Sequence, residues 1–385
     1  MNYSSRAHSE IKRNIKKRCD NIYTNSQGIS NDLKKEMAGF YRVLIRRSIN
    51  LVIVLFLVLV LTVSLLGETM DKILTDNIRQ EVIGSVVDSK IKFQNAKAQQ
   101  AYVDEQIEMR IKNLGLDEPW YSPKRFLNTI FKVMTLDLGR SYFSTSDSGS
   151  PEVIDIIAER VPRTLLLFTS ATVITFVFGL YLGPYLAERY GKTVDKTNVF
   201  VSMFSNSLPT FWVGMIMIYL FAFIVPIFPA RSTPSSSPSD PFYIVDLLYH
   251  MALPLITLVV LSIAVQSYFV RLFVVNILDE DFIKAKRAIG IPKKKILYSH
   301  ALRNAAPPLL NSIIIGLASS FGGALLVEIV FDWPGMGSLF YEAITVFDSP
   351  IIIGLVYVST LIYIAAVFLT DLAYSLFDPR VKAIS

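Results

Sequence analysis

The stretch DEDFIKAKRAIG (residues 279–290), followed by IPKKKILYSHALRNAAPPLL (residues 291–310), is a basic segment between two long apolar runs of the chain. Phe282, Ala285 and Ile289 recur at positions i, i+3 and i+7, which places their side chains on one stripe of a helix. The glycine that ends the first stretch, and the proline that soon follows it, stop this helix and let a second one begin. The pattern predicts two short helices joined by a sharp turn, a shape that suits docking against a partner better than catalysis.

The apolar runs around this segment belong to a larger set that indicates a membrane protein. The chain has 385 residues, of which 52% are hydrophobic, and its mean hydropathy is +0.44. The runs approach the roughly 20 apolar residues that an α-helix needs to cross a bilayer. They predict an all-α membrane protein with six transmembrane helices. The expected spans are residues 48–66, 164–187, 199–228, 250–275, 308–331 and 351–377.

The distribution of lysine and arginine predicts the orientation of these spans. The tail at residues 1–47 carries eleven basic residues and the loop at residues 276–307 carries seven, whereas residues 332–350 on the opposite side carry none. By the positive-inside rule, both termini lie in the cytoplasm of a multi-pass plasma-membrane protein. Residues 67–163 have mixed charge, but a loop of this length translocates regardless of charge, so they are predicted to form an extracytoplasmic insert.

This topology divides the chain into four parts. They are a cytoplasmic basic tail (1–47), a first transmembrane helix (48–66), the insert (67–163) and a five-helix core (164–385) that contains the cytoplasmic hairpin (279–303). Because the basic residues are split between separate loops rather than gathered on one face, nucleic acid is not expected as a partner. Membrane topology explains the distribution of these basic residues better.

The residue patterns of common enzyme classes do not occur in the sequence. Its three histidines, at positions 8, 250 and 300, are far apart and on both sides of the predicted bilayer, so they form no metal site. Residues 191–193, GKT, end like a phosphate-binding loop, but Leu186 stands where that loop needs a glycine. No G-x-S-x-G motif presents a nucleophilic serine. We therefore predict no catalytic residue, no metal site and no cofactor bound by this chain.

Two charged residues, Arg271 and Asp371, stand inside or near the inner ends of predicted spans. An unpaired charge there costs about 2.5–3.5 kcal/mol on insertion scales. We therefore expect Asp371 to be neutralised by a basic group such as Arg271, or Arg271 to extend its side chain to the membrane interface. Gly179 and Gly183, spaced as G-x-x-x-G, favour close packing of the second span against a neighbour, although ordinary helix bundles show the same spacing.

Several short motifs follow one another in the order found in a known family. The hairpin contains KRAIG (286–290) and HALRNA (300–305). Further motifs are LGLDEPW (114–120), LDLGRSY (136–142), IAERVPRTLLL (157–167), SLPTFW (207–212), VEIVFDWPGMG (327–337) and DLAYSLFDPRVK (371–382). Together they resemble the permease subunits of ABC importers, in particular the oligopeptide, dipeptide and nickel subfamily. The general coupling motif of ABC importer permeases is matched only at Ala285, Gly290 and Leu302. The resemblance runs from about residue 40 to residue 382, while the tail and residues 68–100 depart from a typical member.

The resemblance implies a type I ABC importer permease that works in a complex. Its partners would be a second, homologous permease, two ABC ATPase subunits that bind ATP and magnesium, and an extracytoplasmic substrate-binding protein above residues 136–163 and 333–348. The hairpin would insert into a groove on an ATPase subunit, so that ATP-driven closure moves the membrane helices. The implied coupling residues are Asp281, Phe282, Lys284, Ala285, Arg287, Gly290, His300, Leu302 and Arg303. A loop that only sets topology would account for the charges, but not for the two helices and their turn.

The resemblance implies import of di- or oligopeptides. Nickel complexes and oligosaccharides are the alternative cargoes, since related permeases carry them. An uncoupled channel or an ion-driven transporter is a further alternative. Proteins of that class usually show several acids within the membrane or repeated half-domains, and Asp371 alone gives this interpretation little support.

Overall fold

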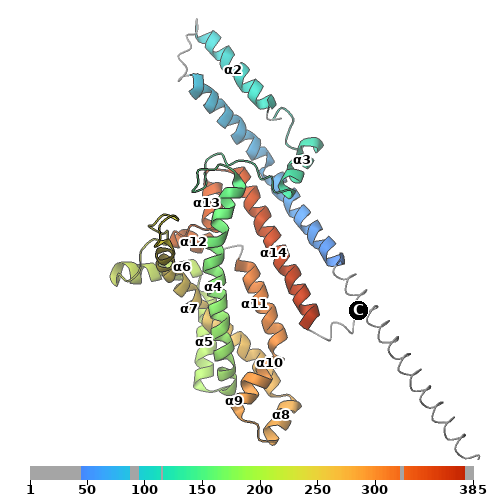
Figure 1. The fold of residues 1–385 in the computed structure, drawn as a ribbon, viewed down its shortest axis with the longest axis vertical. Coiled ribbons are helices and arrows are strands. Elements are labelled where there is room, and N and C mark those ends of the chain that lie inside the picture. Colours follow the sequence, from blue (N-terminus) through green and yellow to red (C-terminus); the bar gives the residue numbers. More distant parts are fainter. Residues whose placement is uncertain (1–44, 87–94, 114–115, 321–324, 378–385) are drawn as a thin grey trace, which may run out of the picture. The chain divides into compact units, whose positions relative to one another are not determined.

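The computed structural model describes residues 45–86, 95–113, 116–320 and 325–377 (Figure 1). The side chains of residues 318–319 and 370–377 lie outside this description. Within the described ranges every regular element is a helix, as an all-α protein requires. The chain forms two units, one of residues 54–367 and one that joins residues 1–53 to residues 368–385. The second unit contributes only the start of the first helix and the end of the last one to the described residues.

In the described ranges, four helices are long and apolar enough to cross a membrane. They are Ile45–Val86, α4 (Val153–Glu188), α7 (Tyr243–Leu278) and the part Ser349–Leu369 of α14 (Ser349–Phe377). The number rises to five if one bent pair of helices counts as a single span. The six predicted spans are therefore not all continuous helices, because the third is broken.

The third predicted span, residues 199–228, is broken into two helices. α5 (Thr193–Ser207) meets the next helix, which is α6 (Thr210–Ile218) continued by the π-helical η1 (Tyr219–Ile224), at an angle of 94°. Leu208 is extended, with φ −87° and ψ 131°, because the ring of Pro209 disfavours helical geometry in the residue before it. Pro209 then starts α6, where a proline leaves no helical hydrogen bond unmade.

The fifth predicted span, residues 308–331, lies only partly within the described ranges. α11 (Ala306–Ser320) forms its first part. α12 (Leu325–Phe331) follows it, and residues 321–324 between the two lie outside the described ranges. A Trp-Pro-Gly turn then leads into α13 (Met336–Thr345). Trp333 in this turn is fully buried, so the turn packs into the protein.

The first helix is longer than the predicted span, because it continues past residue 66 to Val86. Gly67 does not end it; the missing side chain makes room for the ring of Trp120, which a Cβ would approach to 2.5 Å. Beyond this point α2 (Ala96–Asn113) packs its buried Val103 and Ile107 against the first helix, and α3 (Pro123–Met134) follows. The predicted insert is thus largely helical.

α4 and α7 form the centre of the larger unit, and they run in the same direction. Gly179 of α4 lies against Gln266 of α7, and one turn later Gly183 lies against Val270, where a Cβ on either glycine would come within 2.6 Å of the facing side chain. The two backbones can approach this closely only because both positions lack a side chain. The predicted role of the G-x-x-x-G spacing in close packing is confirmed.

Candidate functional site

The predicted hairpin has the expected two arms. The first arm is α8 (Asp281–Ala288), and the second consists of α9 (Lys293–Lys295), the π-helical η2 (Ile296–Ala301) and α10 (Leu302–Asn304). Gly290 joins them with a φ of +79°, a left-handed conformation that favours glycine. α8, α9 and α10 lie together beside the C-terminal ends of α4 and α7 (Figure 1). The prediction of two short helices and a sharp turn is confirmed.

The two faces of α8 differ in what they contact. Ile283 is fully buried, and the second arm buries Ile296, Leu297 and Ala301. Leu297 and Ala301 belong to an apolar cluster that includes Ala187 of α4 and Val270 of α7, so the hairpin is anchored to both long helices. Ile283 was not among the residues predicted for the hairpin's function.

The predicted stripe lies on the opposite, exposed face of α8. Phe282 is 40% exposed and Ile289 is 76% exposed, and Ala285 between them is exposed as well. An exposed phenylalanine and an exposed isoleucine on one helix face form an apolar surface that the described residues leave uncovered, as docking sites often do. The stripe is therefore available to a partner.

The other predicted coupling residues are distributed over both arms. Lys284 pairs with Asp281 at 2.8 Å, and both side chains are well exposed. Arg287 borders a cavity of about 250 Å³ between the hairpin and the C-terminal ends of α4 and α7. Leu302 packs against the apolar cluster, whereas Arg303 is exposed. The structure thus brings the predicted residues into one hairpin but gives them different surroundings.

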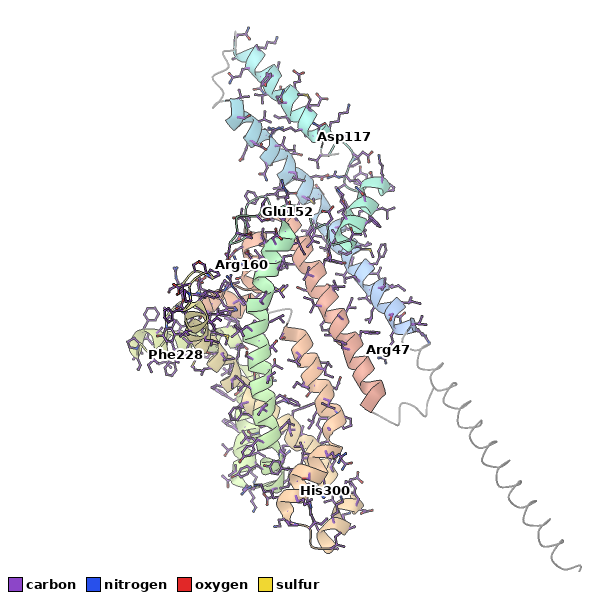
Figure 2. The ribbon with its side chains drawn as sticks, viewed as in Figure 1. Arg47, Asp117, Glu152, Arg160, Phe228 and His300 are labelled. Carbon is purple, nitrogen blue, oxygen red and sulfur yellow. The ribbon has the colours of Figure 1, made fainter. Side chains whose placement is uncertain are left out.

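His300 connects the two arms (Figure 2). The Lys286 ammonium group lies 2.8 Å from Nδ1 of His300, and because lysine has only donors, Nδ1 accepts this hydrogen bond and the ring is neutral. Burial lowers the pKa of His300 below its ordinary value of 6.5, and the positive charges of Lys286, Lys295 and Arg303 lower it further. The neutral ring is therefore part of the hairpin structure.

We expect the folded chain to lose stability as the pH falls below about 6.5. Since the pKa of His300 is lower in the folded chain, the unfolded chain binds the proton first. The stabilising contribution is complete above pH 6.5 and is lost as the pH falls through the lowered pKa. Thermal unfolding of the purified chain between pH 5 and pH 8 measures this. His300→Gln keeps an oxygen that can accept from Lys286 and should weaken the dependence; an unchanged pH profile would contradict the assignment.

Arg271 is paired, but with an acid that sequence analysis did not select. Its Nε and Nη2 donate to the two carboxylate oxygens of Asp195 on α5, at 2.8 and 2.7 Å. Both residues are buried, and the backbone N–H of Gly191 donates to the same carboxylate at 2.9 Å. The expected partner of Arg271 was Asp371; the structure shows Asp195 in its place. The side chain of Asp371 lies outside the described residues, so its own neutralisation stays a prediction.

A second buried acid, Glu328 on α12, was also missed. Its carboxylate accepts hydrogen bonds from the backbone N–H groups of Gly337 and Ser338, at 2.6 and 3.0 Å, and from the hydroxyl of Thr164 on α4, at 2.9 Å. Thr164 in turn accepts from the backbone N–H of Met336 at 2.7 Å. Glu328 therefore fixes the N-terminus of α13 to α4 and α12, where the positive end of a helix dipole favours a carboxylate.

The two loops expected to face a substrate-binding protein meet one another. Asp348 accepts hydrogen bonds from the hydroxyl of Ser141 at 2.6 Å and from the backbone N–H groups of Tyr142 and Phe143 at 3.1 and 3.2 Å. The indole of Trp333 donates to the backbone oxygen of Arg163 at 3.1 Å. Residues 136–163 and 333–348, distant in the sequence, thus form one surface.

Among the described residues, no group of three or more His, Cys, Asp or Glu side chains is placed to hold a metal ion. The functional features of the described chain are instead a hairpin at the C-terminal end of α4 and a buried acid near its N-terminal end. Arg160 and His300 mark these opposite ends (Figure 2). An α-helix of 36 residues is about 54 Å long, which exceeds the thickness of the hydrocarbon core.

Comparison with known proteins assigns the family. Residues 175–383 match the family described as binding-protein-dependent transport system inner membrane component. The chain is 28% identical to the oligopeptide transport system permease protein AppB of Bacillus subtilis (strain 168), over 71% of this chain and 84% of that protein. It is 33% identical to the dipeptide transport system permease protein DppB of the same strain (69% and 81% covered) and 30% identical to DppB of Escherichia coli K12 (71% and 84% covered). The family match covers more than half of the chain, and it confirms the resemblance found in the motifs. The chain belongs to the inner-membrane components of binding-protein-dependent transport systems and is a multi-pass membrane permease of the ABC importer class.

Proposed function

We propose that this permease imports di- or oligopeptides across the plasma membrane. The relatives whose names state a cargo, AppB and the two DppB proteins, are permeases for oligopeptides and dipeptides. In this proposal the path lies between the chain and a second, homologous permease. A substrate-binding protein delivers the cargo to the surface formed by residues 136–163 and 333–348.

The chain itself catalyses no reaction and binds no cofactor in this proposal; two separate ATPase subunits bind ATP and magnesium. Their contact is the exposed stripe of Phe282, Ala285 and Ile289, which is the observation that carries the proposed coupling. The stripe is presented on a helix whose other face is anchored by Ile283. A displacement of the stripe therefore moves the hairpin rather than a loose side chain.

The proposed orientation places the hairpin and both termini in the cytoplasm. It rests on the basic residues of the tail and of residues 276–307, set against the absence of lysine and arginine from residues 332–350. Residues 332–350, which carry no lysine or arginine, meet residues 136–163 at Asp348 and Trp333. In this orientation the hairpin faces the ATPase subunits in the cytoplasm. The surface of residues 136–163 and 333–348 faces the substrate-binding protein outside.

Transport by the reconstituted complex tests the cargo. Proteoliposomes that contain the chain with its copurifying subunits and binding protein should accumulate a labelled di- or oligopeptide only when ATP is present. Uptake of a nickel chelate or an oligosaccharide in place of the peptide would replace the proposed cargo with that alternative. Equal uptake with and without ATP would indicate a channel or an ion-driven transporter.

Gly290→Leu should reduce the peptide imported per ATP hydrolysed. A Cβ at this position meets nothing within 4 Å, so the effect comes from the backbone alone. A left-handed conformation costs a residue with a side chain about 1–2 kcal/mol, which lowers the population of the native turn about 5–30-fold. Gly290→Asn is the matched control, since asparagine tolerates this conformation better and should retain more coupling. A leucine variant with the wild-type ratio of transport to hydrolysis would show that the turn does not couple.

A further inference from the structure

A cavity of about 380 Å³ lies beside the N-terminal half of α5, between this helix and α7. It has the size of a small-molecule pocket. Its lining changes character along α5, because Lys196 stands at one end and Val199, Phe200 and Met203 follow toward the other. These four positions span about 10 Å of helix. The pocket thus has a charged end and an apolar end.

The charged end is formed around Arg271. Two of its guanidinium nitrogens are bound to Asp195, which balances its charge, and the rings of Tyr190 and Tyr268 lie 4.6 and 5.6 Å from the guanidinium carbon. Within the described part of the chain, the third nitrogen, Nη1, makes no hydrogen bond. Lys196 is exposed and has no ion-pair partner among the described residues. This end therefore has a net positive charge and donors that remain available.

The start of α5 adds to this positive charge. The helix has 15 residues, and no side chain caps its N-terminus. The first N–H groups of such a helix carry the positive end of the helix dipole. An anionic group with several oxygens, such as a phosphate, would accept hydrogen bonds from Nη1 of Arg271 and from the ammonium group of Lys196, which both line the cavity.

The apolar end opens toward the surroundings of the helix. Phe200 is 70% exposed and Met203 is 60% exposed. The ring of Phe204, 57% exposed, stacks on that of Phe200 with centroids 6.4 Å apart and extends the apolar surface along α5. Because α5 belongs to a bent pair of helices with the composition of a membrane span, we expect hydrocarbon rather than water beside these side chains.

We propose that this cavity is a binding site for an anionic phospholipid. The phosphate lies against Lys196 and Nη1 of Arg271, and an acyl chain follows Phe200 and Met203. A zwitterionic lipid fits less well, since its ammonium group would meet a site of like charge. Basic pockets between membrane helices are known to recognise anionic headgroups on this principle. This inference depends on the chain being a membrane protein, as its family is, and not on the identity of the proposed cargo.

Native mass spectrometry of the assembled transporter, with phosphatidylglycerol or phosphatidylcholine added, tests the charged end. Wild type should retain phosphatidylglycerol in preference. Lys196→Gln should lower this retention about fivefold. Lys192→Gln is the matched control, because it removes the same charge from the same segment but does not line the cavity. Equal losses in both variants, or equal retention of the two lipids by wild type, would overturn the site.

The apolar end is tested with a fluorescent label on Phe200→Cys. Cys19 is the only cysteine, so Cys19→Ser provides the background. Brominated phosphatidylglycerol should quench this label more than brominated phosphatidylcholine. At the control Val177→Cys, on the 58% exposed Val177 of α4, the two lipids should quench equally. Cross-linking of the cysteine at position 200 to the second permease would instead show that protein covers the cavity. Displacement of phosphatidylglycerol by millimolar inorganic phosphate would show a site for free anions; either result overturns the proposal.

Discussion

Replacing Asp195 with alanine is expected to lower the free energy of unfolding by about 3–5 kcal/mol, because it leaves the buried guanidinium of Arg271 without its counter-charge. The pair is held by two hydrogen bonds of 2.8 and 2.7 Å, and Asp195 is only 2% exposed. The carboxylate also accepts from the backbone of Gly191 at 2.9 Å, just before α5 begins. The substitution therefore weakens the contact of α5 with α7 as well as the start of α5. Thermal unfolding of the purified chain measures the loss.

Two controls separate the buried charge from other effects. Asp195→Leu combined with Arg271→Met removes both charges and keeps apolar volume, so it should recover most of the lost stability. Asp281→Ala breaks the exposed pair with Lys284 and should change stability much less, since exposed ion pairs contribute little. If Asp195→Ala were no more harmful than Asp281→Ala, the buried pair would not hold the two helices together.

Glu328→Ala is the second substitution with a large expected effect. It removes the acceptor of three hydrogen bonds at a site with no solvent exposure and leaves the donors of Gly337, Ser338 and Thr164 unpaired. Each buried, unsatisfied group costs about 1–3 kcal/mol, and because such costs are not additive we expect a loss of about 2–5 kcal/mol. Release of α13 from α4 should also lower transport.

Glu328→Gln is the matched control for this prediction. Its amide oxygen can replace the carboxylate oxygen that accepts from Gly337 and Ser338, so most of the contact remains without the charge. Stability and ATP-driven uptake should therefore fall in the order wild type, glutamine, alanine. An alanine variant that matches the glutamine variant in both measurements would show that these hydrogen bonds do not fix α13.

The hairpin could be predicted from the sequence because its determinants are local. The period of Phe282, Ala285 and Ile289 defines a helix face, and Gly290 defines the turn, within a dozen residues. The solvent exposure of that face could not be predicted, since it depends on the burial of Ile283 and on the packing of the second arm against two distant helices.

The buried charges show where sequence reasoning fails. Arg271 could be selected as a charge in an apolar run, but its partner, Asp195, lies 76 residues away and outside the predicted spans. Periodicity carries no information on such pairings. Glu328 gave a signal of its own, a single acid in the apolar run before the Trp-Pro-Gly turn, and the rule applied to Arg271 and Asp371 would have found it.

The third predicted span differed because hydropathy reports composition and not direction. Residues 199–228 are apolar throughout, yet Pro209 excludes helical geometry at Leu208 and turns the chain by 94°. The first helix differed for the opposite reason. The predicted span stops at residue 66, whereas Gly67 provides space for Trp120 and the helix continues to Val86.

The contact of Gly179 and Gly183 with α7 has a mechanical consequence. Sliding α4 along α7 would drive Val270 and Gln266 out of the space that the glycines leave, so we expect the two helices to move together at this contact. A displacement at one end of the α4–α7 pair is then expected to reach its other end. We expect bending instead at the corner between α5 and α6, just before Pro209, where helices are not packed in this way. The flexibility of that corner then limits how far the α4–α7 pair can tilt.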